Sequence, residues 1–324
     1  MDPSPTRRRT LQLGGTALVA GLAGCLGDDQ PEGTLDFDGL DRVNESSLPS
    51  RQNYRTDERP FPTYRRYDAD DANIVLILLH TAVFDSRILQ PLATAISETG
   101  VAHVVTPDLR GHGSNPNTRG DLSYIGQFQD DLRQLLDSVG LMYPDANVVV
   151  GGHGTGGGIA VKFAAPPSGS LADAYLLLAP YLGPKSPTTK QALGGWANFY
   201  GDRIVMLRVL TGFGLDSYSG MTTVEFDVPE AVRDGNETLE HTYRLMASYT
   251  PDEDAVSEMV AAPTLTVAGT ADVTVDAAAY EPLFADRETA KVELLDGVSH
   301  LDTVLGDDAV EPIVDWLRAL RKSL

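Results

Sequence analysis

Five residues between a run of valines and a glycine-rich segment have the spacing of a turn that presents a nucleophile. Gly152-His153-Gly154-Thr155-Gly156 matches the pattern G-x-S-x-G at every position except the middle one, where glycine replaces serine. In that pattern the outer glycines are needed because the turn is tight, and the serine oxygen attacks a carbonyl carbon to form a covalent acyl intermediate. Gly154 has no side-chain oxygen or sulfur, so it cannot carry an acyl group.

The residues around this turn indicate a strand before it and a helix after it, within a longer alternation of the two. The apolar run at 74–79 is typical of a strand buried on both faces of a parallel sheet. Apolar residues at helical spacing over 87–99 and 125–139 predict two crossover helices. Further strands are expected at 101–106, 147–150, 174–179, 264–268 and 292–295, with a last helix over 309–320. This order predicts an α/β fold with a doubly wound, mostly parallel sheet.

Residues 184–248 interrupt the alternation. They are rich in aromatic and large aliphatic residues and show no clean strand period. We expect an inserted helical lid with an apolar inner face, because a segment of this length in a compact domain needs structure of its own. A pair of ordinary surface helices is the alternative. The core of the domain is then predicted to comprise residues 61–183 and 249–324.

Five segments resemble the α/β-hydrolase superfamily, in particular its monoglyceride-lipase and proline-aminopeptidase-like branch. They are VVGGHGTGGGIAVKFA at the turn, LLHTAVFDSRILQPLA and VVTPDLRGHGSN before it, and PTLTVAGTAD and LLDGVSHLD near the carboxyl end. The resemblance implies that Asp272 is the acid and His300 the base of a triad, in the chain order nucleophile, acid, base. The carboxylate would orient the imidazole and stabilise its protonated form. Asp276, four residues beyond Asp272, is an alternative acid or a helix cap.

The same resemblance implies an oxyanion hole beside the turn. The backbone N–H groups of Thr155 and Ala82 would donate hydrogen bonds to the negative oxygen of the transition state. Thr81 replaces a glycine of the family, and its Cβ is expected to alter the loop that carries Ala82. His80 is expected to brace this loop, and His112 to pack the loop in which it lies.

The glycine at position 154 leaves three explanations open. The chain could be a non-catalytic or weakly active protein that binds a small, partly apolar ester or amide, or another protein. It could instead hydrolyse such a compound with His300 and Asp272 activating water directly, or with Thr155 as a substitute nucleophile. Gly154 could also be an isolated variant of one strain. Because the acid and the base are still predicted, we expect Gly154→Ser to create or strongly raise hydrolysis of short p-nitrophenyl esters.

The first 25 residues have the pattern of a signal peptide rather than of a folded element. Three arginines at 7–9 precede an uncharged, mostly apolar stretch that ends in LAGC. RRRTLQL resembles the twin-arginine export signal, and LAGC resembles a lipobox, in which the cysteine is lipidated after cleavage. We therefore expect export and a lipid anchor on Cys25, the only cysteine, at the outer face of the cytoplasmic membrane. Residues 26–60 are acidic and polar and are expected to form a solvated tether.

The charge of the chain excludes one class of partner. The formal net charge at pH 7 is -21, from 46 acidic and 25 basic residues, so nucleic acid is not an expected partner. An acidic excess with so few lysines is similar to the proteins of salt-loving archaea, which indicates a salty exterior. No two of the six histidines have metal-ligand spacing, and the glycine-rich turn lacks the residues of a phosphate loop. Neither a metal nor an organic cofactor is therefore expected.

Overall fold

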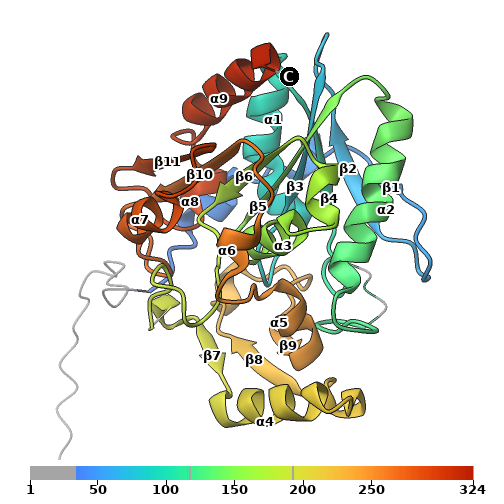
Figure 1. The fold of residues 1–324 in the computed structure, drawn as a ribbon, viewed down its shortest axis with the longest axis vertical. Coiled ribbons are helices and arrows are strands. Elements are labelled where there is room, and N and C mark those ends of the chain that lie inside the picture. The colour runs from blue at the N-terminus through green and yellow to red at the C-terminus, as the bar shows by residue number, and fades with distance from the viewer. Residues whose placement is uncertain (1–33, 115, 117, 192, 324) are drawn as a thin grey trace, which may run out of the picture. The chain divides into compact units, whose positions relative to one another are not determined.

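The structure, a computed structural model, describes residues 34–323 apart from 115, 117 and 192 (Figure 1). The predicted signal peptide, Cys25 and residues 26–33 of the predicted tether lie outside the described residues. Export and lipidation of the chain therefore stay predictions.

An eight-stranded sheet forms the centre of the fold, in the order β1-β2-β4-β3-β5-β6-β10-β11 (Figure 1). Strand β2 is antiparallel to both of its neighbours, and all other pairs from β4 to β11 are parallel. All six residues of β3 are aliphatic and buried, because both faces of the sheet are covered at its centre. The predicted α/β class with a doubly wound, mostly parallel sheet is confirmed. The strands are β1 (Gln52–Asn53), β2 (Thr63–Tyr67), β3 (Ile74–Leu79), β4 (His103–Pro107), β5 (Asn147–His153), β6 (Ala174–Leu178), β10 (Thr264–Gly269) and β11 (Ala290–Leu295).

The helices of the core form two packed groups. In the first, α1 (Gln90–Glu98) contacts α8 (Asp302–Leu305) and α9 (Val310–Ser323). In the second, α3 (Thr155–Ala164) contacts α2 (Gln127–Met142), α5 (Tyr243–Tyr249) and α6 (Ala255–Glu258), while the short α7 (Tyr280–Phe284) lies against β11. Helices α2 and α9 each bury one apolar stripe, as the helical spacing predicts, whereas α3 is buried over most of its surface. Among the described residues, no helix combines the length and the apolar content that crossing a bilayer requires.

The carboxyl ends of the parallel strands meet at one edge of the sheet, where α/β proteins place their sites. Strand β3 leads into Thr81 and Ala82, and β5 leads into Gly154. Strand β10 is followed by Asp272, and β11 by His300. Four segments that are distant in the sequence therefore deliver the predicted site residues to one place.

The insert at 184–248 differs from the predicted helical lid. It contains one long helix, α4 (Gly201–Gly212), and a three-stranded antiparallel sheet of β7 (Ala197–Phe199), β8 (Thr222–Phe226) and β9 (Glu240–Thr242) (Figure 1). Strands of three to five residues are too short to show a clear period of two, and their partners lie far apart in the sequence. The predicted apolar inner face is present in Trp196 and Phe226, which are buried against each other with ring centroids 5.0 Å apart.

The segment 34–60 also differs from its prediction, because it packs on the core instead of forming a solvated tether. Leu35, Phe37 and Tyr54 are buried in the hydrophobic core, and β1 adds an edge strand to the sheet. The apolar residues of this segment are isolated and follow neither a helical nor a strand period. The sequence therefore indicates neither their burial nor the edge strand.

Candidate active site

The turn at Gly154 has a backbone that only glycine adopts without strain. Gly154 joins β5 to α3 with φ 54° and ψ -116°, which lies outside the regions that residues with a Cβ favour. Its two flanking glycines are required by sterics. A Cβ on Gly152 would overlap the backbone of Gly156, and a Cβ on Gly156 would overlap the carbonyl oxygen of Leu79. The strand and the helix therefore approach as closely as the two outer glycines of the G-x-S-x-G pattern predict.

The predicted base and acid are in direct contact beside this turn. His300 Nδ1 lies 2.6 Å from Asp272 Oδ2, and both side chains are buried. Asp272 Oδ1 accepts hydrogen bonds from the N–H and hydroxyl of Thr274 and from the N–H of Val275. Burial alone would raise the pKa of Asp272, but the neighbouring His300 and these donors outweigh it and hold that pKa below its usual value. Asp272 is thus a carboxylate that keeps the Nδ1 proton on His300.

Asp276, the alternative acid, does not reach His300. Its side chain is exposed, and it forms no side-chain cap for the short turn that follows it. Of the two carboxylates that the sequence left open, the geometry therefore selects Asp272.

His153 supports the orientation of His300. Its Nε2 donates to the backbone oxygen of His300 at 3.0 Å, and the two imidazole rings lie in contact, tilted by 35° with centroids 4.5 Å apart. Burial lowers the pKa of His153 far below its usual value, and the charge of His300 lowers it further. A neutral ring is consequently packed against His300, where a charged one would oppose its protonation.

Thr81 occupies the space into which a side chain at position 154 would project. A Cβ built on Gly154 would overlap the hydroxyl oxygen of Thr81 and lie 3.0 Å from its Cβ. The same point lies 3.3 Å from His300 Nε2. A side chain at position 154 therefore requires Thr81 to shift, and the effect of Gly154→Ser on activity stays a prediction.

The two predicted oxyanion donors line the same pocket as His300 and Gly154. Thr155 is the first residue of α3, so its N–H has no partner within the helix and lies at the positive end of the helix dipole. The N–H of Ala82 forms no hydrogen bond with any other described residue. Both groups are therefore free to bind a negatively charged oxygen.

His80 braces the loop that carries Thr81 and Ala82. Its Nε2 accepts a hydrogen bond from the N–H of Leu109 at 3.0 Å, so Nδ1 carries the proton and donates to the carbonyl oxygen of Thr81 at 2.8 Å. Burial lowers the pKa of His80, which favours this neutral form. In the same loop Val83 has a φ of 74°, a left-handed conformation that is strained for a β-branched residue.

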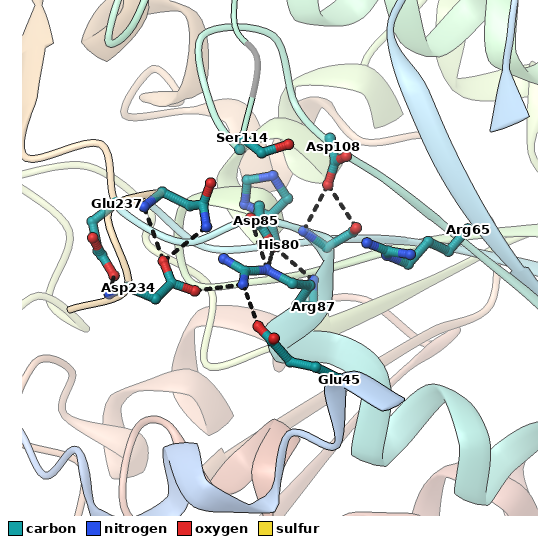
Figure 2. A network of polar contacts seen from close by, with 12 residues as sticks. Glu45, Arg65, His80, Asp85, Arg87, Asp108, Ser114, Asp234 and Glu237 are labelled. Atoms are coloured by element: carbon teal, nitrogen blue, oxygen red, sulfur yellow. Dashed lines mark hydrogen bonds and ion pairs between the residues drawn. The ribbon is translucent and has the colours of Figure 1, made fainter. Parts of the chain in front are cut away.

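A network of charges holds the far end of this loop (Figure 2). Arg87 binds Asp85 at 2.9 Å and Glu45 at 2.7 Å, and it also binds Asp234 from the insert. Asp108 accepts hydrogen bonds from the backbone and the hydroxyl of Ser86. The network ties the loop to the amino-terminal segment, to the end of β4 and to the insert, which supports the strained backbone at Val83.

His112 and His241 extend a buried row of imidazoles from His80 toward the insert. The ring centroids of His80 and His112 are 5.2 Å apart, as are those of His112 and His241. Burial lowers the pKa of His241 to about 3 and lowers that of His112 well below its usual value. These neutral rings pack the loops together, as predicted for His112. No group of three or more potential metal ligands occurs among the described residues.

The pocket above the turn is small and apolar. Its volume is about 50 Å³. A larger pocket of about 550 Å³ lies beside it, under α4, and shares Tyr181 and Phe199 with it. The residues that line the smaller pocket are Thr81, Ala82, Gly154, Thr155, Ala179, Tyr181, Leu193, Trp196, Ala197, Phe199, Phe226, Tyr249, Thr274, Val275 and His300.

Comparison with known families agrees with this arrangement. Residues 70–303 match the model of the family described as serine aminopeptidase, S33. The chain belongs to this family. It is thereby a member of the α/β-hydrolase superfamily, whose expected segment order the fold reproduces.

Solved structures show how far the likeness in fold extends. A monoglyceride lipase from Saccharomyces cerevisiae, solved with a substrate analogue, has a TM-score of 0.67 at 14% identity, covering 85% of this chain and 96% of its own. A carboxyl esterase from Bacillus coagulans, in complex with glycerol, has a TM-score of 0.62 at 16% identity, covering 83% and 98%. A Paleococcus ferrophilus monoacylglycerol lipase has a TM-score of 0.56 at 19% identity, covering 80% and 98%. At these identities the likeness concerns the fold. No curated protein sequence matches this member of the family.

One residue and one contact of the site were missed by sequence reasoning. Thr274 bonds to Asp272 and lies 3.0 Å from His300 Nδ1, and its position two residues after an aspartate is typical of an Asx turn, which was a usable signal. The contact of Thr81 with position 154 had no signal, because it joins loops that are 73 residues apart in the sequence and depends on side-chain placement.

Proposed function

We propose that this protein is a slow hydrolase of small, partly apolar esters, in which His300 activates water and no acyl group is carried at position 154. The observation that carries the proposal is the intact contact between Asp272 and His300 Nδ1 at 2.6 Å, with Nε2 beside the pocket. Burying an aspartate or a histidine without a partner would cost free energy of folding, and the hydrogen bond between them offsets that cost. The same hydrogen-bonded pair is the arrangement that general-base catalysis needs.

The proposed reaction uses the groups at the sheet edge in two steps. His300 Nε2 removes a proton from water while the water oxygen adds to the carbonyl carbon of the ester, and the carbonyl oxygen becomes negatively charged. The N–H groups of Ala82 and Thr155 donate to that oxygen. When the intermediate collapses, the alkoxide leaves and takes the proton from His300 Nε2, which restores the neutral imidazole. Asp272 stabilises the imidazolium between the two steps.

The substrate class follows from the lining of the pocket. Trp196, Phe226 and Val275 make much of the pocket lining apolar, which suits an aliphatic acyl group. The adjoining larger pocket has room for further substrate atoms. The structural neighbours include monoglyceride lipases and an esterase in complex with glycerol, which supports an ester over other acyl compounds.

Binding without turnover is the second candidate function. It is favoured by Gly154 itself and by the hydroxyl of Thr81, which fills the space of the missing side chain. In a serine hydrolase, loss of the nucleophile alone costs about 10⁶-fold in kcat. Under this candidate the pocket holds the same class of ligand, and the Asp272–His300 pair is a retained structural contact.

His300→Ala distinguishes the two candidates. We expect the natural chain to hydrolyse p-nitrophenyl butyrate in molar salt above the buffer rate, and His300→Ala to lower kcat by about 10²–10⁴-fold, because general-base catalysis is lost. The measurement is steady-state release of p-nitrophenolate, with His103→Ala as the control because His103 lies on β4, away from the pocket. Equal rates for the natural chain and His300→Ala would favour binding without turnover.

We also propose that the protein is exported in folded form and anchored by lipid at Cys25, facing a salty exterior. The order of RRRTLQL, an apolar stretch and LAGC supports this, as does the acidic composition. We expect Cys25→Ser to move the protein from the membrane fraction to the soluble or medium fraction of a salt-loving host, as measured by immunoblotting. Retention of Cys25→Ser in the membrane fraction would contradict a lipid anchor at this residue.

A further inference from the structure

Gly154 and Thr81 are neighbours in the pocket, and the side chain of Thr81 fills the space that a side chain at position 154 would need. Position 154 lacks a side chain, and the hydroxyl oxygen of Thr81 lies so close to the Cβ that such a side chain would carry that the two atoms would overlap. The position of that Cβ lies 3.3 Å from His300 Nε2. The elbow therefore offers no hydroxyl at this point, whereas Thr81 brings one beside it from the loop after β3.

The hydroxyl of Thr81 is held in place by its surroundings. Thr81 is buried, its carbonyl oxygen accepts a hydrogen bond from His80, and a β-branched side chain has few rotamers. The charged network around Arg87 fixes the remainder of the loop (Figure 2). Ordering of this kind is what a group needs in order to position a reactant.

We infer that Thr81 Oγ1 binds the water molecule that attacks the ester, and so is a positioning residue for the proposed reaction. The water donates one hydrogen to His300 Nε2 and the other to Thr81 Oγ1, which leaves a lone pair of its oxygen directed at the carbonyl carbon. No hydrogen bond joins Thr81 Oγ1 directly to His300 Nε2 among the described residues, so each atom is available to the water. The inference rests on the proposed function. It adds that Thr81 positions the attacking water beside the elbow, where a side-chain nucleophile is absent.

A covalent role for Thr81 is a distinct chemistry, and the test must separate it from the water-binding role. If Thr81 itself attacked, its oxygen would form an acyl ester and a fluorophosphonate would modify it. If it binds water, no covalent adduct forms.

Thr81→Val and Thr81→Ser test the inference in the full-length protein. Valine keeps the branched shape and removes the hydroxyl, and serine keeps the hydroxyl. We expect Thr81→Val to lower kcat for p-nitrophenyl butyrate by about 10–10²-fold with KM changed by less than about threefold, since only the attacking water loses a partner. Thr81→Ser should recover most of the lost kcat. Thermal unfolding followed by circular dichroism should show similar melting temperatures for the two variants, which excludes a general loss of structure.

The other outcomes separate the inference from the proposed function. A natural kcat in Thr81→Val, together with a loss of activity in His300→Ala, would overturn the role of Thr81 and leave the proposed function in place. A rate that does not depend on His300 would overturn both. A fluorophosphonate adduct on Thr81, found by peptide mass spectrometry, would overturn the water-binding role in favour of a covalent one.

Discussion

Combining Thr81→Gly with Gly154→Ser is expected to produce a serine hydrolase, whereas Gly154→Ser alone is not. In the single variant the new side chain overlaps the hydroxyl of Thr81, and a residue with a Cβ must also adopt the strained backbone at φ 54°. Removing the side chain of Thr81 opens the space for a serine hydroxyl next to His300 Nε2, while Asp272 and the two backbone donors stay in place.

The expected gain in the double variant is large. Loss of the nucleophile from a serine hydrolase costs about 10⁶-fold, so we expect kcat for p-nitrophenyl butyrate to rise by at least about 10³-fold over the natural chain, allowing for an imperfectly placed serine. The cost of backbone strain, about 1–3 kcal/mol, should appear as a lower melting temperature. Burst kinetics and a fluorophosphonate adduct at position 154 are the measurements.

Thr81→Gly and Gly154→Ser as single variants are the matched controls. If Gly154→Ser alone reacts with the fluorophosphonate as fast as the double variant does, Thr81 does not obstruct position 154. If neither Gly154→Ser nor the double variant reacts with the fluorophosphonate, the pair of Asp272 and His300 is not competent as a base.

The second large effect is expected from Asp272→Asn. The Asn amide would donate to His300 Nδ1, so the imidazole would carry its proton on Nε2 and could no longer accept one there. In the Thr81→Gly/Gly154→Ser background we expect kcat to fall by about 10⁴-fold, and in the natural chain we expect it to fall to the rate of His300→Ala. The Asn oxygen can still accept from Thr274 and Val275, so the fold should be retained.

Asp276→Asn is the control for this experiment, because Asp276 was the competing acid in the sequence and is exposed in the structure. It should leave kcat unchanged. A loss of activity in Asp276→Asn equal to that in Asp272→Asn would show that the structure assigns the acid to the wrong carboxylate.

The parts of the fold that could be predicted are those with a strong local pattern. Strand β3 follows from a continuous apolar run of six residues, and the apolar stripes of α2 and α9 follow from helical periodicity over longer segments. Strands β1 and β2 and the sheet of the insert were missed, because these strands of two to five residues have no continuous aliphatic run and are too short for a period of two to emerge. The packing of Leu35 and Phe37 was missed for the same reason.

Taken alone, the sequence determined the α/β class, the tight turn at Gly154, the absence of a side-chain nucleophile there, and the short list of acids and bases that could act beside it. These properties depend on residue identity and on order along one strand–turn–helix unit, which are local. The tertiary structure decided that Asp272 rather than Asp276 meets His300, and that Thr81 fills the space at position 154. Both depend on distances between loops that follow different strands, and such distances exist only once the sheet has brought the strand ends together.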